Sequence, residues 1–162
     1  ALMLFKNVLV PYDESEHAAA ALHLAIDLVG DDPEATIRVV TVVSNDIMPP
    51  SALSAAVAFD TSPVSYENYE ALLSHIAERS DRELHDDVAG LLGRDLQGIH
   101  AKLVIETRLA GSPVEGITNY AMDHRCDLIV MGRRGLGALR GMLGSVSYGV
   151  LRSADIPVLT VK

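Results

Sequence analysis

Short apolar segments alternate strictly with amphipathic segments along this chain of 162 residues, and no other feature restricts its fold as much. The apolar segments are rich in β-branched residues, which favour strands. The segments between them repeat their apolar residues every three or four positions, as helices do. Strands are therefore predicted over 5–10, 36–43, 101–107, 127–131 and 156–161, and helices over 16–29, 66–92, 113–124 and 145–153.

The predicted strands are apolar on both faces, which is typical of a parallel sheet covered by helices on both sides. With right-handed crossovers, this order predicts one domain over 1–162: a doubly wound α/β fold whose five-stranded parallel sheet has the order 3-2-1-4-5. Met3 is the expected natural start, with Ala1 and Leu2 an addition before it. The connection over 44–65 is harder to assign, although 51–59 has the composition of a short helix.

Local signals mark where several elements begin or end. Pro11 is expected to stop the first strand, and Ser15 is the predicted N-cap of the first helix. Ser112 is the predicted N-cap of the helix that follows the third strand, and Pro113 its first residue. In doubly wound sheets, ligands bind beyond the carboxyl ends of the strands, where the strand order reverses.

Composition and charge exclude several classes of protein. There are 13 basic and 22 acidic residues, so the net charge is −9, and a broad nucleic-acid-binding surface is not expected. No apolar run approaches the ~20 residues of a membrane span. Lys6 and Asn7 interrupt any signal peptide. The single cysteine, Cys126, excludes an intramolecular disulfide and a cysteine-rich zinc site. We therefore expect a cytoplasmic protein that contacts neither membrane nor nucleic acid.

The basic residues are unevenly distributed. Residues 124–152 hold five arginines and one acid, Asp127, so this window carries +4 and the rest of the chain −13. Within the window, the segment 132–147 is rich in glycine, follows an apolar strand and opens a helix. Glycines allow close backbone approach, and a helix N-terminus offers unpaired N–H groups. With the hydroxyl of Ser145, these features favour a phosphate site; the alternative is an ordinary glycine loop with solvated arginines.

The glycine segment resembles the signature of the universal stress protein family, within the adenine-nucleotide α-hydrolase-like superfamily. That signature is G-x2-G-x9-G-[S/T], and Gly132, Gly135, Gly144 and Ser145 match it. One departure is that eight residues, not nine, separate Gly135 from Gly144. The segments 8–15, 111–113, 130–132 and 156–161 also resemble the family.

The resemblance implies that the chain binds ATP or another adenine nucleotide, with or without Mg²⁺. Asp13 would lie near the base and ribose, and the main chain of Val42 near the adenine, although these residues also suit a turn and a buried strand. The implied site residues are Pro11, Tyr12, Asp13, Val42, Gly111, Met131, Gly132, Arg134, Gly135, Gly144, Ser145, Val146 and Ser147.

A homodimer is predicted through the last strand, Pro157 to Val161, because an apolar strand at an open sheet edge invites pairing. The resemblance implies the same dimer. It also implies a role in stress response or signalling, exerted through conformation and dimerisation. An alternative is a family member that binds no nucleotide and works as a dimeric interaction module.

Catalytic alternatives have little support. The chain has no Gly-Lys pair for a P-loop and no H-x-G-H or S-G-G-x-D motif. No catalytic residue is predicted, and slow ATP hydrolysis through a bound metal and water is the most we expect. A phosphoacceptor receiver domain shares the strand order, and Asp13-Glu14 resembles its acidic pair. It needs an aspartate at the end of the third strand, where Glu106 and Thr107 are expected here.

Two other residue types do not suggest a site. The six histidines lack metal-binding spacing, so no metal ligand is predicted among them. Cys126 is expected to be a small buried residue rather than a nucleophile.

Overall fold

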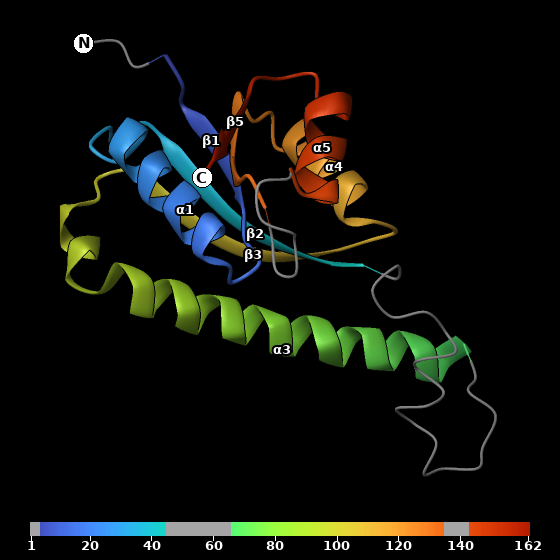
Figure 1. The fold of residues 1–162 in the computed structure, drawn as a ribbon. Helices are drawn as coiled ribbons and strands as arrows, with labels where there is room; N and C mark the ends of the chain where they lie inside the picture. The colour runs from blue at the N-terminus through green and yellow to red at the C-terminus, as the bar shows by residue number, and fades with distance from the viewer. Residues whose placement is uncertain (1–3, 45–65, 135–142) are drawn as a thin grey trace.

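The computed structural model describes residues 4–44, 66–134 and 143–162. It confirms the predicted fold: five parallel strands form one sheet in the order β3-β2-β1-β4-β5 (Figure 1). The strands are β1 Asn7–Pro11, β2 Thr36–Ser44, β3 Lys102–Ala110, β4 Leu128–Gly132 and β5 Val158–Val161. The strand order reverses between β1 and β4, which are neighbours in the middle of the sheet.

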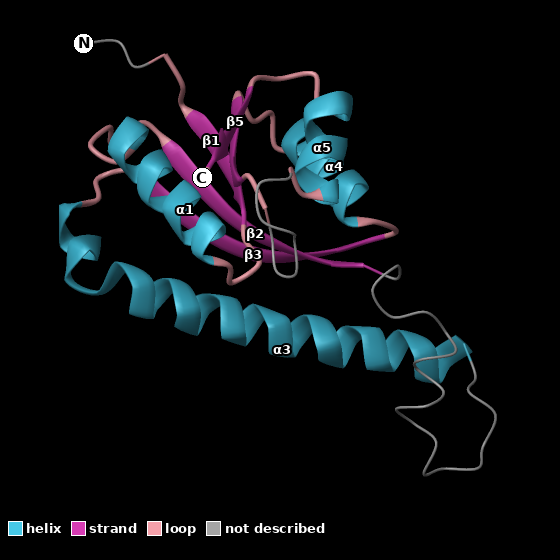
Figure 2. Ribbon diagram, in the orientation of Figure 1, coloured by secondary structure: helices cyan, strands magenta, loops and turns pink. Residues whose placement is uncertain are grey.

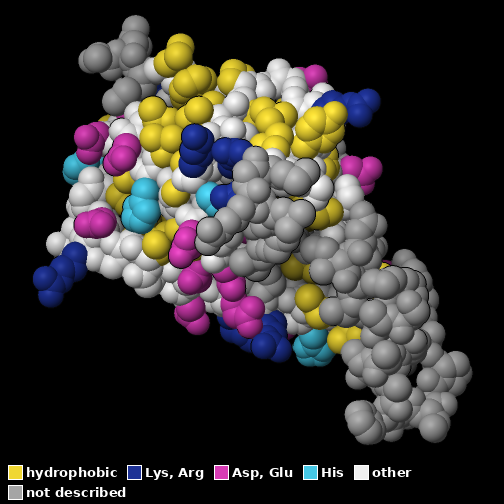
Figure 3. Space-filling view, viewed as in Figure 1, with side chains coloured by type: hydrophobic (Ala, Val, Ile, Leu, Met, Phe, Trp, Pro, Cys, Tyr) yellow, Lys and Arg dark blue, Asp and Glu magenta, His cyan; other side chains and the backbone are white. Residues whose placement is uncertain are grey.

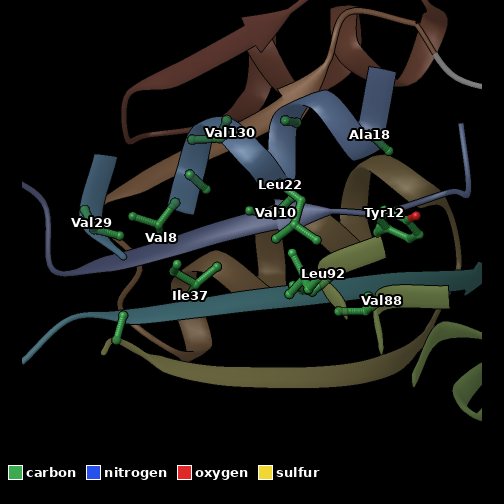
Figure 4. Packing of buried hydrophobic residues seen from close by; sticks show 14 of the residues in the cluster. Val8, Val10, Tyr12, Ala18, Leu22, Val29, Ile37, Val88, Leu92 and Val130 are labelled. Atoms are coloured by element: carbon green, nitrogen blue, oxygen red, sulfur yellow. The ribbon is translucent and has the colours of Figure 1, made fainter. Parts of the chain in front are cut away.

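Helices cover both faces of the sheet (Figure 2). They are α1 Glu16–Val29, α3 Tyr66–Leu92, α4 Pro113–Asp123 and α5 Ser145–Ser153, with a short 3-10 helix over Gly93–Gly98. One core lies between the sheet, α1 and α3, and includes Val10, Leu22 and Val88 (Figure 4). The second lies between the sheet, α4 and α5, and includes Leu9 and Ile129. None of the described helices combines the length and the apolar character needed to cross a membrane.

All five strands differ by one or more residues from their predicted bounds, and the differences at β1, β5 and β3 have a visible reason. β1 extends one residue past its predicted end and includes Pro11 as its last residue. The strand continues this far because the next N–H, from Tyr12, still donates to Val40 O at 2.9 Å. β5 begins at Val158, because Pro157 has no N–H to give to the ladder and contributes only its carbonyl, to Ile129.

The prediction that β3 ends at Thr107 is wrong. The strand continues to Ala110, pairing Arg108 with Val42 and Ala110 with Ser44. A charged residue is tolerated there because the Arg108 guanidinium lies over the Tyr120 ring, 5.5 Å from its centre. Glu106 is therefore inside the strand, and the strand ends without the aspartate that a receiver domain needs. The predicted helix over 51–59, like Gly135, lies outside the described residues.

Candidate functional site

Helices α1, α4 and α5 begin at the carboxyl end of the sheet, because they follow β1, β3 and β4. Each therefore directs its first, unpaired N–H groups toward that end of the molecule. Such groups attract anions, and a carboxylate in the first turn competes for them. The three N-termini differ in how their N–H groups are occupied.

The N-terminus of α1 is closed by acidic and hydroxyl side chains. Its N-cap is Ser15, as predicted, and the Ser15 hydroxyl accepts from the Ala18 N–H at 3.1 Å. One carboxylate oxygen of Asp13 accepts from the Ser15 N–H at 3.1 Å and from its hydroxyl at 2.5 Å. Glu16 adds a second carboxylate in the first turn. Asp13 thus has the turn role that the sequence left open, and an anion approaching α1 would meet like charge.

The N-terminus of α4 is closed in a similar way. The hydroxyl of Ser112, the predicted N-cap, accepts from the Glu115 N–H at 3.2 Å, and Pro113 begins the helix. The Glu115 carboxylate folds back over this end: one oxygen lies 3.1 Å from the position that a Cβ on Gly111 would take. The pair Ser112 and Glu115 has the spacing of a capping box. Gly111 therefore lies beside the N-terminus of α4, where the Glu115 carboxylate of the same helix offsets the partial positive charge of the first N–H groups.

The N-terminus of α5 is different, because no acidic residue lies in its first turn. Its N-cap is Gly144, which has no side chain to bond the first N–H groups, and the next residue, Ser145, is exposed. Two hydrogen bonds hold this turn against the end of β4. The Gly144 N–H donates to Arg133 O at 3.0 Å, and the buried Ser147 hydroxyl donates to Gly132 O at 2.8 Å. The first turn of α5 is therefore fixed in place, and its N-terminus is open in the sense that no acidic residue lies in that turn.

Gly132, the last residue of β4, packs closely against the start of α1. A Cβ at Gly132 would come within 2.8 Å of the His17 side chain and backbone, so only glycine allows this approach. Met131, the residue before it, is buried in the core against α4 and α5. The turn that carries Asp13 and the first turn of α5 consequently lie on either side of the same glycine.

Val42 lies toward the same end of the sheet, on β2 beside β1. Its side chain is half-buried beside α4, where a Cβ on Gly116 would lie 2.5 Å from it. The neighbouring Thr41 donates its hydroxyl to Tyr12 O at 2.9 Å. β2 and the chain after β1 are thus tied together just before Asp13.

Tyr12 brings its backbone, but not its side chain, to this edge. Its ring is buried in the core against α1 and α3, and its hydroxyl donates to Asp87 on α3 at 2.5 Å. Burial, and then the Asp87 carboxylate, raise the pKa of the Tyr12 hydroxyl well above its usual value of 10. Sequence reasoning did not single out Asp87 or Glu115.

The remaining predicted site residues lie at different places, and one of them lies outside the described residues. Pro11 is half-buried at the end of β1, and Val146, in the first turn of α5, packs against the second core. Arg134 is half-buried after β4, at the limit of the described chain. Gly135 lies outside the described residues, so its contribution stays a prediction. Within residues 4–44, 66–134 and 143–162, no three His, Cys, Asp or Glu side chains gather as a metal site would require.

The fold is that of a doubly wound α/β protein, and among the described starts of α1, α4 and α5 at the carboxyl end of its sheet, that of α5 has no acidic residue in its first turn. The model of the Universal stress protein family matches residues 4–162. A relative from Thermus aquaticus, named as the universal stress protein in the QAH/OAS sulfhydrylase 3' region, is 30% identical over 162 residues, covering 98% of this chain and 100% of the relative. The chain belongs to the universal stress protein family.

Solved structures show the same fold. The protein MJ0577 superposes with a TM-score of 0.71 at 23% identity, over 99% of this chain and 97% of that one. A universal stress protein in complex with cAMP has a TM-score of 0.57 at 20% identity, over 97% and 96% of the two chains. One from Archaeoglobus fulgidus in complex with dAMP has 0.56 at 16% identity, over 99% and 100%.

Proposed function

We propose that this protein binds an adenine nucleotide at the carboxyl end of its sheet, with the phosphates over the first turn of α5. The observation that carries the proposal is the contrast among the three helix N-termini at this end. Those of α1 and α4 have acidic residues in their first turn, whereas that of α5 has none. A phosphate therefore meets donors without like charge at α5 alone among the three.

The donors at α5 suit a phosphate in number and in kind. The N–H groups of Ser145, Val146 and Ser147 belong to the first turn, where no preceding helical carbonyl accepts from them. The Ser145 hydroxyl is exposed beside them. Hydrogen bonds to a charged group contribute about 1.5–3 kcal/mol each, so two or three suffice for appreciable affinity. Gly144 has φ −65° and ψ 153°, a conformation open to any residue, so a larger side chain there would act by obstructing the phosphate rather than by straining the turn.

The adenosine end is proposed to lie across β1 and β2. The main chain near Val42 offers the adenine edge both a donor and an acceptor, and Asp13 offers the ribose an acceptor. The cAMP and dAMP complexes of structural relatives support adenine as the base. We expect ATP as the ligand, with Mg²⁺ held mainly by its own phosphates. Because eight residues rather than nine separate Gly135 from Gly144, we expect this chain to hold the outer phosphates less tightly than the first phosphate.

Calorimetric titration of the purified protein with ATP, ADP, AMP and GTP tests this proposal, after mass spectrometry of any molecule released on denaturation. We expect an adenine nucleotide to bind with a Kd below about 1 mM, which corresponds to about −4 kcal/mol, and GTP to bind more weakly. Equal affinity for AMP and ATP would mean that only the adenosine end and the first phosphate are held. No binding of any nucleotide, and nothing co-purifying, would overturn the proposal and favour the interaction module.

The second part of the proposal is a homodimer through β5, and the two sheet edges support it by their difference. β3 forms one edge and carries the charges of Lys102, Glu106 and Arg108, which discourage pairing with another strand. β5 forms the other edge and has no charged residue. Exposed apolar side chains lie on β5 and on α5, which contacts it; they are Tyr148, Leu151 and Leu159.

Apolar side chains gather on the upper part of the face drawn in Figure 3, where Figure 1 places β5 and α5. A second copy meeting this edge would cover them, in the cytoplasm, where the buried free thiol of Cys126 stays reduced. In this proposal, nucleotide occupancy changes the surface that the dimer offers to a stress-response partner.

Sedimentation velocity of Leu159→Lys tests the dimer, with Leu96→Lys as the matched control. The two leucines are similarly exposed, 38% and 42%, but Leu96 lies in the 3-10 helix rather than on β5. We expect the wild type and Leu96→Lys to sediment as dimers at micromolar concentration and Leu159→Lys as a monomer. A monomeric wild type, or a Leu159→Lys variant that stays dimeric, would contradict the proposal.

A further inference from the structure

Tyr12 is held at three points, although its side chain does not reach the proposed nucleotide. Its N–H donates to Val40 O at 2.9 Å, its carbonyl accepts from the Thr41 hydroxyl at 2.9 Å, and its own hydroxyl donates to Asp87 at 2.5 Å. The ring lies in the core with Ala18, Leu22 and Val88 (Figure 4). The backbone just before Asp13 is therefore fixed both by β2 and by a helix far away in sequence.

The Asp87 contact reaches the proposed site through a continuous series of bonds. Tyr12 is followed directly by Asp13, whose carboxylate accepts from the N–H and hydroxyl of Ser15. The Ser15 hydroxyl in turn accepts from Ala18, in the first turn of α1 against which Gly132 packs. Glu14, inside this turn, has a φ of 64°, a left-handed conformation that neighbouring contacts must maintain. The geometry of Asp13 therefore depends on groups outside the turn itself.

Asp87 lies where α3 enters the core. Leu84 and Val88, on either side of it in sequence, are buried in the core, whereas Asp87 itself is half-buried. A carboxylate in this position strengthens the hydrogen bond that it accepts, because charged acceptors form stronger bonds than neutral ones. Leu84 and Val88 already hold this part of α3 in the core. The hydrogen bond between Asp87 and Tyr12 is therefore not needed to anchor the helix and can orient Tyr12 instead.

We propose that Asp87, acting through the Tyr12 hydroxyl, is a positioning residue of the nucleotide site that sets the turn carrying Asp13. This inference rests on the proposed function, since it assigns a role within that site. It extends the site to α3, a helix in which the sequence pointed to no functional residue. Tyr12 then serves the ligand through its backbone rather than as a contact.

Four variants separate positioning from stability. Tyr12→Phe keeps the buried ring and loses the donor, while Asp87→Ala loses the acceptor. Asp87→Asn keeps an acceptor oxygen. Asp86→Ala, at the exposed neighbouring position on the same helix, makes the same change in charge without touching Tyr12. ATP affinity is measured by calorimetry at 20 °C, and the melting temperature of each nucleotide-free variant is measured separately.

Tyr12→Phe and Asp87→Ala are expected to weaken ATP binding roughly three- to tenfold, which is the scale of one hydrogen bond. Asp86→Ala should stay within about twofold of the wild type, and Asp87→Asn, which keeps a neutral acceptor, should lie between the wild type and Asp87→Ala. The double variant Tyr12→Phe/Asp87→Ala should bind no more weakly than either single variant, because both remove the same bond. If the wild type binds ATP and both single variants bind it equally well, whatever their melting temperatures, the positioning role is wrong. If the wild type binds no adenine nucleotide, the proposed function fails, and this inference fails with it.

Discussion

The two ends of the sheet are organised in opposite ways. At the amino end, polar groups bond one another: the Asp127 carboxylate accepts from the N–H groups of Lys6 at 2.8 Å and Asn7 at 3.1 Å. The Asn7 side chain donates to His124 O at 2.7 Å and accepts from Arg38 at 2.9 Å. At this end, hydrogen bonds among the polar groups connect β1, β2 and the chain that enters β4.

The carboxyl end is the end where we propose that a ligand binds. The N-termini of α1 and α4 are closed by their own caps, while the first turn of α5 is held in place by Gly132 and Arg133 and carries no acid. From this difference we infer that the amino end serves stability and propose that the carboxyl end serves nucleotide binding. Substitutions at the amino end should therefore change the melting temperature, whereas those at the open N-terminus of α5 should change the ATP affinity.

The largest effect is expected from an acid at the open N-terminus. Ser145→Asp would give α5 the first-turn carboxylate that α1 and α4 already have, so it should repel phosphate and lower ATP affinity by more than about 100-fold, the loss of two charge-assisted bonds. The same acid favours the helix dipole, so the melting temperature should hold or rise. Calorimetry and thermal melting measure the two effects.

Ser153→Asp is the matched control, because it makes the same substitution at the last residue of the same helix. There the acid opposes the dipole and should lower stability by a few tenths of a kcal/mol or more. ATP affinity should be unchanged. Unaltered binding by Ser145→Asp would mean that the phosphates lie elsewhere.

At the amino end, Asp127→Ala should have the opposite signature. It removes the acceptor for two backbone N–H groups, which costs about 2 kcal/mol and lowers the Tm by roughly 4–8 °C for a domain of this size. ATP affinity, measured well below the Tm, should stay within about twofold. Asp155→Ala, at an exposed position, is the control and should change neither quantity. A large loss of affinity in Asp127→Ala without loss of stability would contradict the division between the two ends.

A smaller effect is expected at the closed N-terminus of α4. Ser112→Ala removes the hydroxyl that accepts from Glu115 and should cost about 1 kcal/mol of stability, as the loss of an N-cap usually does. Because this cap lies at the carboxyl end but serves the helix itself, ATP binding should not change. Reduced affinity in this variant would show that α4 also takes part in binding.

The smallest effect at neutral pH is expected at Cys126, which is buried just before β4 at the amino end. Burial, the main cause, raises the pKa of its thiol from about 9 to about 11. The native thiol should therefore resist alkylation at pH 8, in contrast to the unfolded chain. As the pH rises from 9 toward 11, the unfolded chain ionises first, so the contribution of this neutral thiol to stability is complete below pH 9 and declines above it.

Thermal melting of the wild type and Cys126→Ala across this pH range isolates the thiol. The wild type should lose more stability than Cys126→Ala as the pH rises. Equal pH dependence in the two proteins, or rapid alkylation of the native thiol, would mean that Cys126 is exposed to solvent.

The fold was predictable from the sequence because each strand and helix has its own local signal and the topology follows from their order. The error at the end of β3 lies where a tertiary contact outweighs the local signal. β3 runs past Thr107 because Tyr120 accommodates Arg108, a contact that strand hydrophobicity does not reveal.

The candidate site was predictable in part. The glycine-rich segment and the Ser145 hydroxyl were predicted from their residue types, and Gly132 and Gly144 were singled out through the resemblance to the family signature. Glu115 had a usable signal, because Ser112-x-x-Glu115 is a capping-box pattern. Asp87 had none, since it is one of many acids on α3 and only the folded chain brings it to the hydroxyl of Tyr12.

The position of the phosphates is tested most directly by a titration of ¹⁵N-labelled protein with ATP, followed through its amide resonances. We expect the largest shifts at Ser145, Val146 and Ser147 and further shifts at Asp13 and Val42, while Val114, Glu115 and Gly116 in the first turns of α4 change little. Shifts centred on the start of α4, or none at any of these amides at millimolar ATP, would contradict binding at the open N-terminus of α5.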